Sequence, residues 1–465
     1  MNRIRFKSQK QGGGLARLFS ALAVMAAFFL PLQTQAAIDT VTGPNFTLTA
    51  GEGYASFADG GRMYSWGYSV AGTPMQLPGP TLEVTEGDVV TITLNNNLPA
   101  AAGNVSIVFP GQQVSSTGGV KGALTAEAPI GGSVTYTFTA RKPGTYEYHS
   151  GTHSDLQVEM GLYGALIVRP ASIAGGIPTN PVLKKTYAGC AYDHPDTCYD
   201  REYLFLLSEM DRNVHELVAQ QVANGAKSIN IGTGEIKANY FMINGRSGPD
   251  TLGAPGRELL PNQPYNIVPR MHPGEKLLLR IVGAGQHMHP FHTHGNNARL
   301  LARDGNLLVN DNNKLDGPDL FTFPATPGGT MDALFRWTGK DLGWDMYGHT
   351  AADNVPCNDT DGDGYNDDPA GEPGEYCADH NKAIPVQLPD LNVMAFGGFY
   401  GGSPYLGNLG SLPPGEGGLN PNAGFAYMWH SHAERELTNY NVYPGGMLTM
   451  LIIEAPSTII SPTRP

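Results

Sequence analysis

Short segments in which apolar and polar residues alternate are the feature that most limits how this chain can fold. Residues 81–94 alternate in this way on both sides of Gly87-Asp88, a pattern that predicts a β-hairpin. Further strands are expected, between turn residues, at 106–109, 133–140, 145–149, 162–169, 240–244, 276–282, 298–302, 331–337 and 447–454. With 60 Gly, 36 Pro and 15% charged residues, the composition favours many short strands over long amphipathic helices. We therefore predict an all-β protein.

The expected strands fall into two groups along the chain. Residues 37–170 form the first predicted β-sandwich domain and residues 200–457 the second, with a Pro-, Gly- and Ala-rich linker at 171–199. The second domain is interrupted at 348–424 by an insertion rich in Gly and Pro, and a loop of that length is usually functional or held in place by something.

One helix is expected inside the second domain. Asp211 can cap residues 212–223, where Val214, Leu217, Val218 and Val222 recur at helical spacing. Sequence motifs for a phosphate-binding loop or a hydrolase nucleophile elbow do not occur in the chain.

Residues 1–36 have the composition of an export signal. Basic residues precede an apolar run at 18–30, and Thr34-Gln35-Ala36 offers a small-residue cleavage site. That run is too short to span a bilayer, and no later segment approaches ~18 uninterrupted apolar residues, so we expect release into the periplasm or outside the cell. Cleavage removes five basic and no acidic residues, so the formal net charge moves from −13 to −18, which disfavours nucleic acid and anionic lipid as partners.

The four cysteines form two local pairs, Cys190 with Cys198 and Cys357 with Cys377. An exported chain meets an oxidising environment, so each pair is expected to form a disulfide that closes a loop. Metal ligation by these thiols is the alternative, although neither pair has the close spacing of a zinc knuckle.

The segment between Cys357 and Cys377 has the pattern of a calcium-binding loop. Its carboxylates alternate before a glycine, which lets a turning chain wrap oxygen ligands around calcium, and the expected ligands are Asp359, Asp361, Asp363, Asp367 and the carbonyl of Tyr365. Ala370 stands where a bidentate glutamate is usual, so Glu372 or a neighbour would have to replace it. A solvated acidic loop without calcium is the other interpretation.

Three short groups of histidines lie at or near the ends of expected strands. They comprise His149 with His153, the run from His287 to His294, and His430 with His432. An H-x-H pair in an extended chain directs both imidazoles to one side, so the pairs His292/His294 and His430/His432 would form a nitrogen-rich site if they faced each other. Imidazoles without thiolate or many carboxylates suit copper or zinc. A single histidine is usually a satisfied polar residue, but three groups in one chain favour a metal site.

These motifs resemble those of multicopper oxidases. The segment HPFHTHG at 289–295 resembles their H-P-x-H-x-H-G motif, YHS at 148–150 with GLYG at 161–164 resembles their Y-H-S-H…G-L-Y-G segment, and WHSH at 429–432 with GM at 446–447 is similar to their H-C-H…G-M ending. The resemblance implies two cupredoxin-like Greek-key β-sandwich domains, copper as cofactor, and a homotrimer with copper between subunits.

Departures from the family pattern remove part of its copper complement. VFPG at 108–111 stands where the family has the H-x-H-G motif of its first domain. Ser431 replaces the cysteine that binds the family's blue copper, Glu436 stands at the spacing of a later histidine ligand, and a hydroxyl cannot replace a thiolate as soft ligand and electron relay. His289 is then expected to be an orphan of that site. The expected copper ligands are His149, His153, His292, His294, His430 and His432, with His287 as a further candidate.

Two functions follow from this pattern. The first is an exported copper-dependent oxidoreductase with a mononuclear or dinuclear histidine site and no blue copper centre, which meets a small-molecule substrate or an electron-transfer partner directly. The second is a non-catalytic cupredoxin scaffold or copper-storage protein of the cell envelope. Keeping both H-x-H pairs favours the first, and losing the cysteine favours the second.

Overall fold

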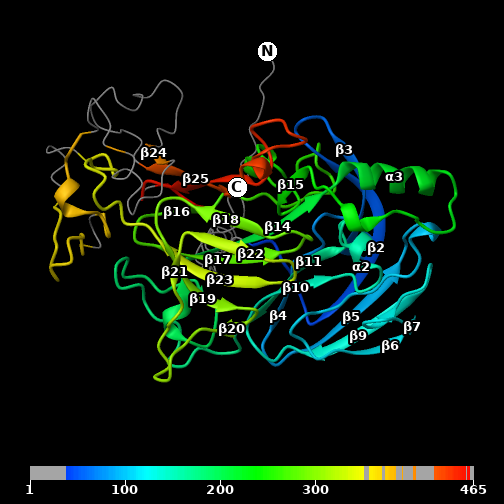
Figure 1. Ribbon diagram of the computed structural model, residues 1–465. Coiled ribbons are helices and arrows are strands. Elements are labelled where there is room, and N and C mark those ends of the chain that lie inside the picture. Colours follow the sequence, from blue (N-terminus) through cyan, green and yellow to red (C-terminus); the bar gives the residue numbers. More distant parts are fainter. Residues whose placement is uncertain are drawn as a thin grey trace, which may run out of the picture. The chain divides into compact units, whose positions relative to one another are not determined.

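The computed structural model describes residues 38–349, 356–368, 372–383, 390, 402–404, 424–456 and 458–460. Strands dominate these residues, which confirms the predicted all-β class (Figure 1). The described helices are α2 (Ser154–Gln157), α3 (Arg212–Ala223) and the short 3-10 turns η1 (Ala100–Ala102), η2 (Pro195–Thr197), η3 (Thr233–Glu235), η4 (Asp250–Leu252), η5 (Cys377–Asp379) and η6 (Glu434–Leu437). None of these helices is long and apolar enough to cross a bilayer. The expected export signal lies outside the described residues.

The first half of the chain forms two main sheets that enclose one core. One has the order β1 (Val41–Thr42), β4 (Leu82–Thr85), β11 (Tyr163–Arg169), β10 (Gly144–His149). The other has the order β3 (Arg62–Val70), β2 (Asn45–Ser56), β5 (Val89–Asn96), β9 (Ser133–Thr139), β6 (Ser115–Gly118), with the small pair β7 (Val120–Lys121) and β8 (Ala126–Glu127) nearby. Alternate residues of these strands, such as Leu82, Ile92 and Leu166, are fully buried in a shared core.

The hairpin predicted at residues 81–94 is wrong, although both strands exist. The chain turns at Gly87, whose φ is +92°, but β4 and β5 belong to different sheets. Asp88 closes the turn by accepting a hydrogen bond from the backbone N–H of Thr85. The alternation predicts which side chains are buried. It does not separate two strands of one hairpin from two strands in facing sheets, because the same side chains are buried in both arrangements.

The strand expected at 106–109 is also wrong. Val105 and Val108 each form an isolated bridge, to Ala128 and His149 respectively. The apolar side chains of Ile107 and Phe109 are buried as predicted, but the backbone changes partner within three residues, so no ladder forms.

The second half of the chain forms two larger sheets. The first contains β15 (Tyr240–Ile243), β14 (Arg201–Met210), β17 (Lys276–Gly283), β23 (Thr330–Arg336), β19 (Ala298–Arg303) and β20 (Asn306–Leu307), with β21 (Asp319–Leu320) also paired to β19. The second contains β16 (Arg270–Met271), β26 (Leu448–Ile453), β25 (Phe425–Ser431), β18 (His289–Thr293) and β22 (Thr322–Ala325), with β24 (Gly402–Pro404) paired to β25. Aromatic side chains such as Phe205, Phe291 and Trp429 pack between the sheets.

Two local predictions in this half are confirmed. Helix α3 has the predicted bounds, and the side chain of Asp211 accepts a hydrogen bond from the backbone N–H of Asn213, as an N-cap does. Both disulfides are formed, and Cys190–Cys198 links the hairpin of β12 (Gly189–Cys190) and β13 (Cys198–Tyr199). The domain boundaries at 37–170, 171–199 and 200–457 remain predictions.

A buried ionic network joins the two pairs of sheets. Glu202 on β14 accepts hydrogen bonds from Arg169, at the end of β11, and from Arg280 on β17, each at 2.7 Å. Burial alone would raise the pKa of Glu202, but the two guanidinium charges outweigh it and lower the pKa to about 2. Because Glu202 and Arg280 are fully buried, each charge depends on its partners for stabilisation.

Candidate metal centre

Four histidines meet on two neighbouring strands, β18 and β25. These strands are antiparallel, and His292 lies directly opposite His430 in their register. His294 and His432 each follow two residues later and so point to the same side as the first histidine of their pair. We call these four residues the four-histidine cluster. The predicted convergence of the two H-x-H pairs is present in the structure.

The rings of the four-histidine cluster are packed edge to face. The ring centroid of His292 lies 4.7 Å from that of His294, 4.9 Å from that of His432 and 5.6 Å from that of His430. The Nε2 atoms of His294 and His430 are 3.1 Å apart. His292, His294 and His430 are buried, whereas the side chain of His432 is half exposed. The cluster therefore has a closed interior and one side open to solvent.

Three of these rings are neutral near pH 7. Burial, reinforced by the neighbouring rings, lowers the pKa of His292 to about 4 and that of His294 to about 3. Burial also lowers the pKa of His430, against the opposing effect of its hydrogen bond to a backbone carbonyl. Neutral imidazole nitrogens carry the lone pairs that a transition metal needs.

The hydrogen bonds define which nitrogens carry those lone pairs. Nδ1 of His430 lies 2.7 Å from the carbonyl of Ser431 and must donate to it, so Nε2 of His430 has a lone pair. Nε2 of His294 then donates across the 3.1 Å contact, which leaves a lone pair on Nδ1 of His294. That atom is buried and has no hydrogen-bond partner. An unpaired buried acceptor among neutral imidazoles, with no buried carboxylate in the set, fits a copper or zinc ion.

The ring nitrogens of the four-histidine cluster do not surround a single point. Among the described residues, two groups of three or more His, Cys, Asp or Glu side chains have ligand atoms that all lie within 4.8 Å of one another, and neither group includes the four-histidine cluster. A metal bound by three of its rings would require these side chains to rotate.

The other predicted copper ligands lie apart from this cluster. His149 ends β10, and its Nδ1 donates to the carbonyl of Ser150 at 3.0 Å. His153 is exposed at the start of α2, where it lines a surface cavity of about 460 Å³. His287 is half exposed, with Nδ1 3.8 Å from Glu209. In the part of the chain that the structure describes, no hydrogen bond or ring contact joins His149 or His153 to the four-histidine cluster.

His289, the expected orphan of the absent blue copper site, is the centre of a buried ionic cluster. Its Nε2 lies 2.7 Å from Glu209 and its Nδ1 lies 2.9 Å from Glu436. Ser431 donates a 2.5 Å hydrogen bond to the same carboxylate oxygen of Glu436. We call His289, Glu209, Glu436 and Ser431 the His289 cluster. Because Glu209 lies on β14, 80 residues before His289, no local pattern in the sequence signalled this contact.

The His289 cluster holds a proton rather than offering a soft metal ligand. Burial alone would lower the pKa of His289, but the hydrogen bonds and charges of the two glutamates outweigh it and raise the pKa to about 9. Both ring nitrogens of the imidazolium carry protons, so neither has a lone pair for a metal. The described residues contain no free cysteine. These side chains, as arranged, do not fit a copper centre that needs a thiolate.

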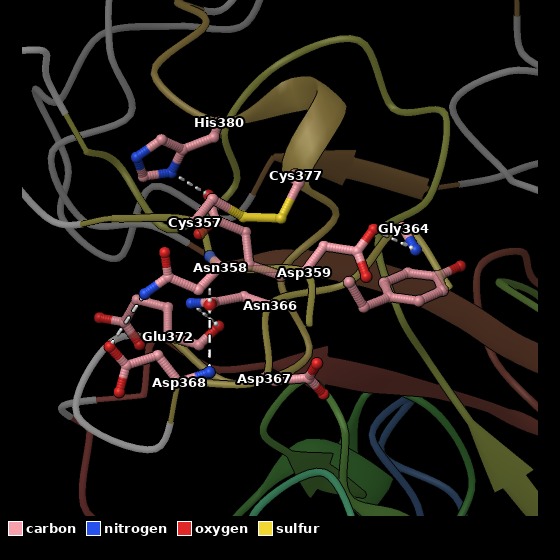
Figure 2. Close-up of a disulfide and its surroundings, with 12 residues drawn as sticks. Cys357, Asn358, Asp359, Gly364, Asn366, Asp367, Asp368, Glu372, Cys377 and His380 are labelled. Atoms are coloured by element: carbon pink, nitrogen blue, oxygen red, sulfur yellow. Dashed lines mark hydrogen bonds and ion pairs between the residues drawn. A yellow bond between two sulfur atoms is a disulfide. The ribbon is translucent and has the colours of Figure 1, made fainter. Parts of the chain in front are cut away.

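The predicted calcium loop is closed by the Cys357–Cys377 disulfide (Figure 2). Carboxylate oxygens of Asp359, Asp361 and Asp363 lie within 4.8 Å of one another on the surface. Asp359 already accepts hydrogen bonds from the backbone N–H groups of Gly362 and Gly364, at 2.7 and 3.0 Å, as capping carboxylates do in loops without metal. Asp367 instead binds Thr360. The proposed Tyr365 carbonyl ligand is untested, and calcium stays a prediction.

Known proteins resemble this chain in sequence over part of its length. A family model described as Multicopper oxidase matches residues 63–172. The iron transport multicopper oxidase fetC of Epichloe festucae is 42% identical over 102 residues, which are 21% of this chain and 16% of that protein. L-ascorbate oxidase of Brassica rapa is 38% identical over 174 residues (37% and 26%), and Copper resistance protein A of Escherichia coli is 29% identical over 182 residues (38% and 25%). Each match thus spans about a quarter or less of the relative's length.

The likeness in fold extends over more of the chain than the likeness in sequence. A solved structure entitled Multicopper Oxidase mgLAC superimposes with a TM-score of 0.50 and 20% identity, covering 90% of this chain and 87% of that one. At this identity the likeness shows the fold alone, and it agrees with the paired sheets described above in giving two cupredoxin-like sandwiches. The sequence matches over part of the chain and the fold over most of it thus make this protein similar to multicopper oxidases.

Proposed function

We propose that this protein is a copper-binding oxidoreductase that works from the four-histidine cluster without a blue copper centre. The observation that carries the proposal is the register that sets His292 opposite His430 in a buried group of neutral imidazoles. Copper held there would supply one-electron chemistry between its two oxidation states.

The residues around the cluster give it two properties. Nδ1 of His292 is 2.8 Å from the hydroxyl of Thr322, an outer contact that helps to orient the ring. The half-exposed ring of His432 leaves one side accessible to a reductant. Because Ser431 cannot relay electrons as a thiolate does, the substrate or electron-transfer partner has to reach this side directly.

Names of the relatives agree with redox chemistry on small molecules or metal ions, since they include a laccase, an L-ascorbate oxidase and an iron transport oxidase. Because each relative is matched over a minor part of its length, the substrate class is part of the proposal rather than a property transferred from them.

A second candidate is a copper-storage or scaffold protein. The specific observation in its favour is the His289 cluster, which puts an ion pair where the family resemblance places the electron-accepting copper. Copper Resistance protein A, one of the relatives, is named for copper tolerance rather than for a substrate.

The finer parts of the proposal concern location, assembly and calcium. Export to the periplasm or the outside rests on residues 1–36, and the calcium loop rests on its carboxylate pattern. A homotrimer is proposed because His149 and His153 make no contact with the four-histidine cluster of their own chain, whereas a neighbouring copy can supply them. Light scattering of the purified protein with and without copper tests the assembly.

Copper analysis with electron paramagnetic resonance tests the main proposal. We expect bound Cu²⁺ without intense blue absorption. We also expect copper-dependent oxidation of a phenolic or metal-ion reductant when a one-electron acceptor such as ferricyanide is added to re-oxidise the copper. The double variant His292→Ala, His430→Ala should lose both copper and turnover, while His153→Ala tests whether the first sandwich contributes. Copper binding without turnover of any reductant would support storage, and a wild-type protein that binds no copper would refute both candidates.

A further inference from the structure

A second group of potential metal ligands lies outside the four-histidine cluster, beside the disulfide of the insertion. Asp345, His349, Glu375 and His380 each offer one ligand atom, and these four atoms all lie within 4.8 Å of one another. The sequence did not single out any of them, because the two histidines stand 31 residues apart with no motif between them. His380 lies next to the Cys357–Cys377 disulfide in Figure 2.

We propose that these four residues bind a divalent d-block cation such as Zn²⁺, in a structural site that holds the insertion against the second sandwich. The proposal is independent of the function proposed for the four-histidine cluster.

The distances between the ligand atoms match a tetrahedral site. Nδ1 of His349 lies 3.1 Å from Oδ2 of Asp345 and 3.5 Å from Oε1 of Glu375. Nδ1 of His380 lies 3.7 Å and 2.7 Å from the same two oxygens. Zinc bonds of about 2.0–2.2 Å at tetrahedral angles separate neighbouring ligand atoms by about 3.3–3.5 Å, which is the middle of the observed range.

Burial and an unpaired atom show that these contacts are not a surface ion-pair group. Asp345, Glu375 and His349 are 2%, 2% and 8% exposed. Nδ1 of His349 has no hydrogen-bond partner even though it is 3.1 Å from Asp345, and Oε2 of Glu375 is also buried without one. Nδ1 of His349 thus lies close to a carboxylate without hydrogen-bond geometry. The surrounding carboxylates raise the pKa of His349 to about 12, so a divalent cation that binds here takes the place of a proton on this ring.

The ligands are held by their own backbone surroundings. Asp345 accepts hydrogen bonds at Oδ1 from Tyr347 N–H (2.8 Å) and at Oδ2 from Asn381 N–H (3.0 Å), while its own N–H donates to the carbonyl of Lys382. These bonds join the segment that carries His349 to the segment that carries His380. Nε2 of His349 is 3.6 Å from the Glu372 carboxylate, the kind of outer partner that metal-bound imidazoles have.

The donor set selects the class of ion. Calcium and magnesium prefer six or more oxygen ligands, whereas two imidazoles and two carboxylates at four corners suit Zn²⁺ or a similar transition ion. Two buried carboxylates side by side also need a compensating positive charge, which a divalent ion supplies when bound and a protonated His349 supplies otherwise.

The role of such an ion follows from what the first segment contacts. Trp344, next to Asp345, stacks on Phe425 at the start of β25, with ring centroids 6.0 Å apart. Binding would therefore fix the insertion to the strand whose other end carries His430, in addition to the crosslink of the disulfide.

Metal stoichiometry in the full-length protein tests the proposal. The background variant His292→Ala, His430→Ala removes the four-histidine cluster as a competing site. After stripping with a chelator and reloading with ZnCl₂, this background should retain one equivalent of zinc by mass spectrometry. Adding His349→Ala and Glu375→Gln should reduce it to none, and adding the control Asp363→Asn should leave it unchanged. Zinc content that does not respond to His349→Ala and Glu375→Gln would overturn the site.

Cobalt substitution keeps the test decisive if the added substitutions prevent folding. Co²⁺ added to the unmodified background should give the intense visible bands of a tetrahedral ion, and zinc should slow proteolysis between residues 345 and 383. Weak octahedral bands, or no spectral change, would refute tetrahedral binding and leave a histidine–carboxylate ion-pair group. Because the background lacks the four-histidine cluster, either result is distinguishable from failure of the copper proposal.

Discussion

The charge on His289 makes the stability of this protein depend on pH in a way that can be calculated. In the folded protein the pKa of His289 is about 9, whereas an unfolded histidine titrates near 6.5. A raised pKa means that the folded state binds the proton more tightly, so its stabilising effect is complete below about pH 6.5 and is lost as pH rises through about 9. At about 1.4 kcal/mol per pKa unit, the shift from 6.5 to about 9 corresponds to about 3 kcal/mol.

The double variant His289→Gln, Glu209→Gln is the matched neutral reference. It removes the imidazolium together with its fully buried carboxylate partner, so that no unpaired buried charge remains on β14. Glu147, whose pKa burial raises to about 8, contributes equally to the pH dependence of both proteins. The charge of Glu209 adds to the effect of burial in raising the pKa of Glu159 to about 8, so the comparison is repeated with Glu159→Gln added to both proteins. The difference between the two proteins therefore reports on the His289 cluster.

Urea denaturation followed by tryptophan fluorescence at about pH 6 and about pH 10 measures this difference in metal-free protein. We expect the free energy of unfolding of the wild type to fall between these pH values by about 3 kcal/mol more than that of the double variant. Equal pH dependence in the two proteins would show that His289 is neutral in the folded state, and the account of the His289 cluster would be wrong.

Three further predictions concern single substitutions. Ser431→Cys alone adds a buried thiol but gives no intense blue absorption with Cu²⁺, because His289 stays protonated between its two glutamates; a strong blue band would contradict this. Glu202→Gln leaves the fully buried guanidinium of Arg280 and the partly buried one of Arg169 short of a counter-charge and should lower the free energy of unfolding by about 3–5 kcal/mol. Arg299→Ala, which removes an exposed ion pair, should change it by less than about 1 kcal/mol; similar values for both would disprove the importance of burial. Cys377→Ser should speed chymotrypsin cleavage after Tyr365, within the segment that the disulfide closes, and unchanged cleavage would mean that other contacts hold that segment.

Local signals in the sequence predicted the elements that depend on local physics. Helix α3 needs only a capping Asp211 and apolar residues on one face, and both are visible within 13 residues. The H-x-H pairs likewise follow from strand geometry, since alternate residues share a face wherever the strand is placed.

Features that depend on which strands meet could not be predicted. The alternation at residues 81–94 reports burial but not the sheet to which each strand belongs, so a turn between two sheets had the appearance of a hairpin. The pairing of His289 with Glu209 could not be predicted because the two residues are distant in sequence. Asp345, His349, Glu375 and His380 are likewise brought together only by the folding of the insertion. The signs in the sequence that part of the insertion is held in place were the pair Cys357 and Cys377 and the carboxylate pattern between them.

The backbone ladder between β18 and β25 is what sets the spacing of the four-histidine cluster. Since His292 and His430 lie on hydrogen-bonded strands and His294 and His432 directly follow the ends of these strands, the distance between the pairs is fixed by the sheet before any ligand arrives. Inserting one residue between Trp429 and His430 would turn the following imidazoles to the opposite face of the sheet. Chemistry at this position is therefore open to change by replacing single side chains around the rings, as at Ser431, while the backbone positions of the histidines stay the same.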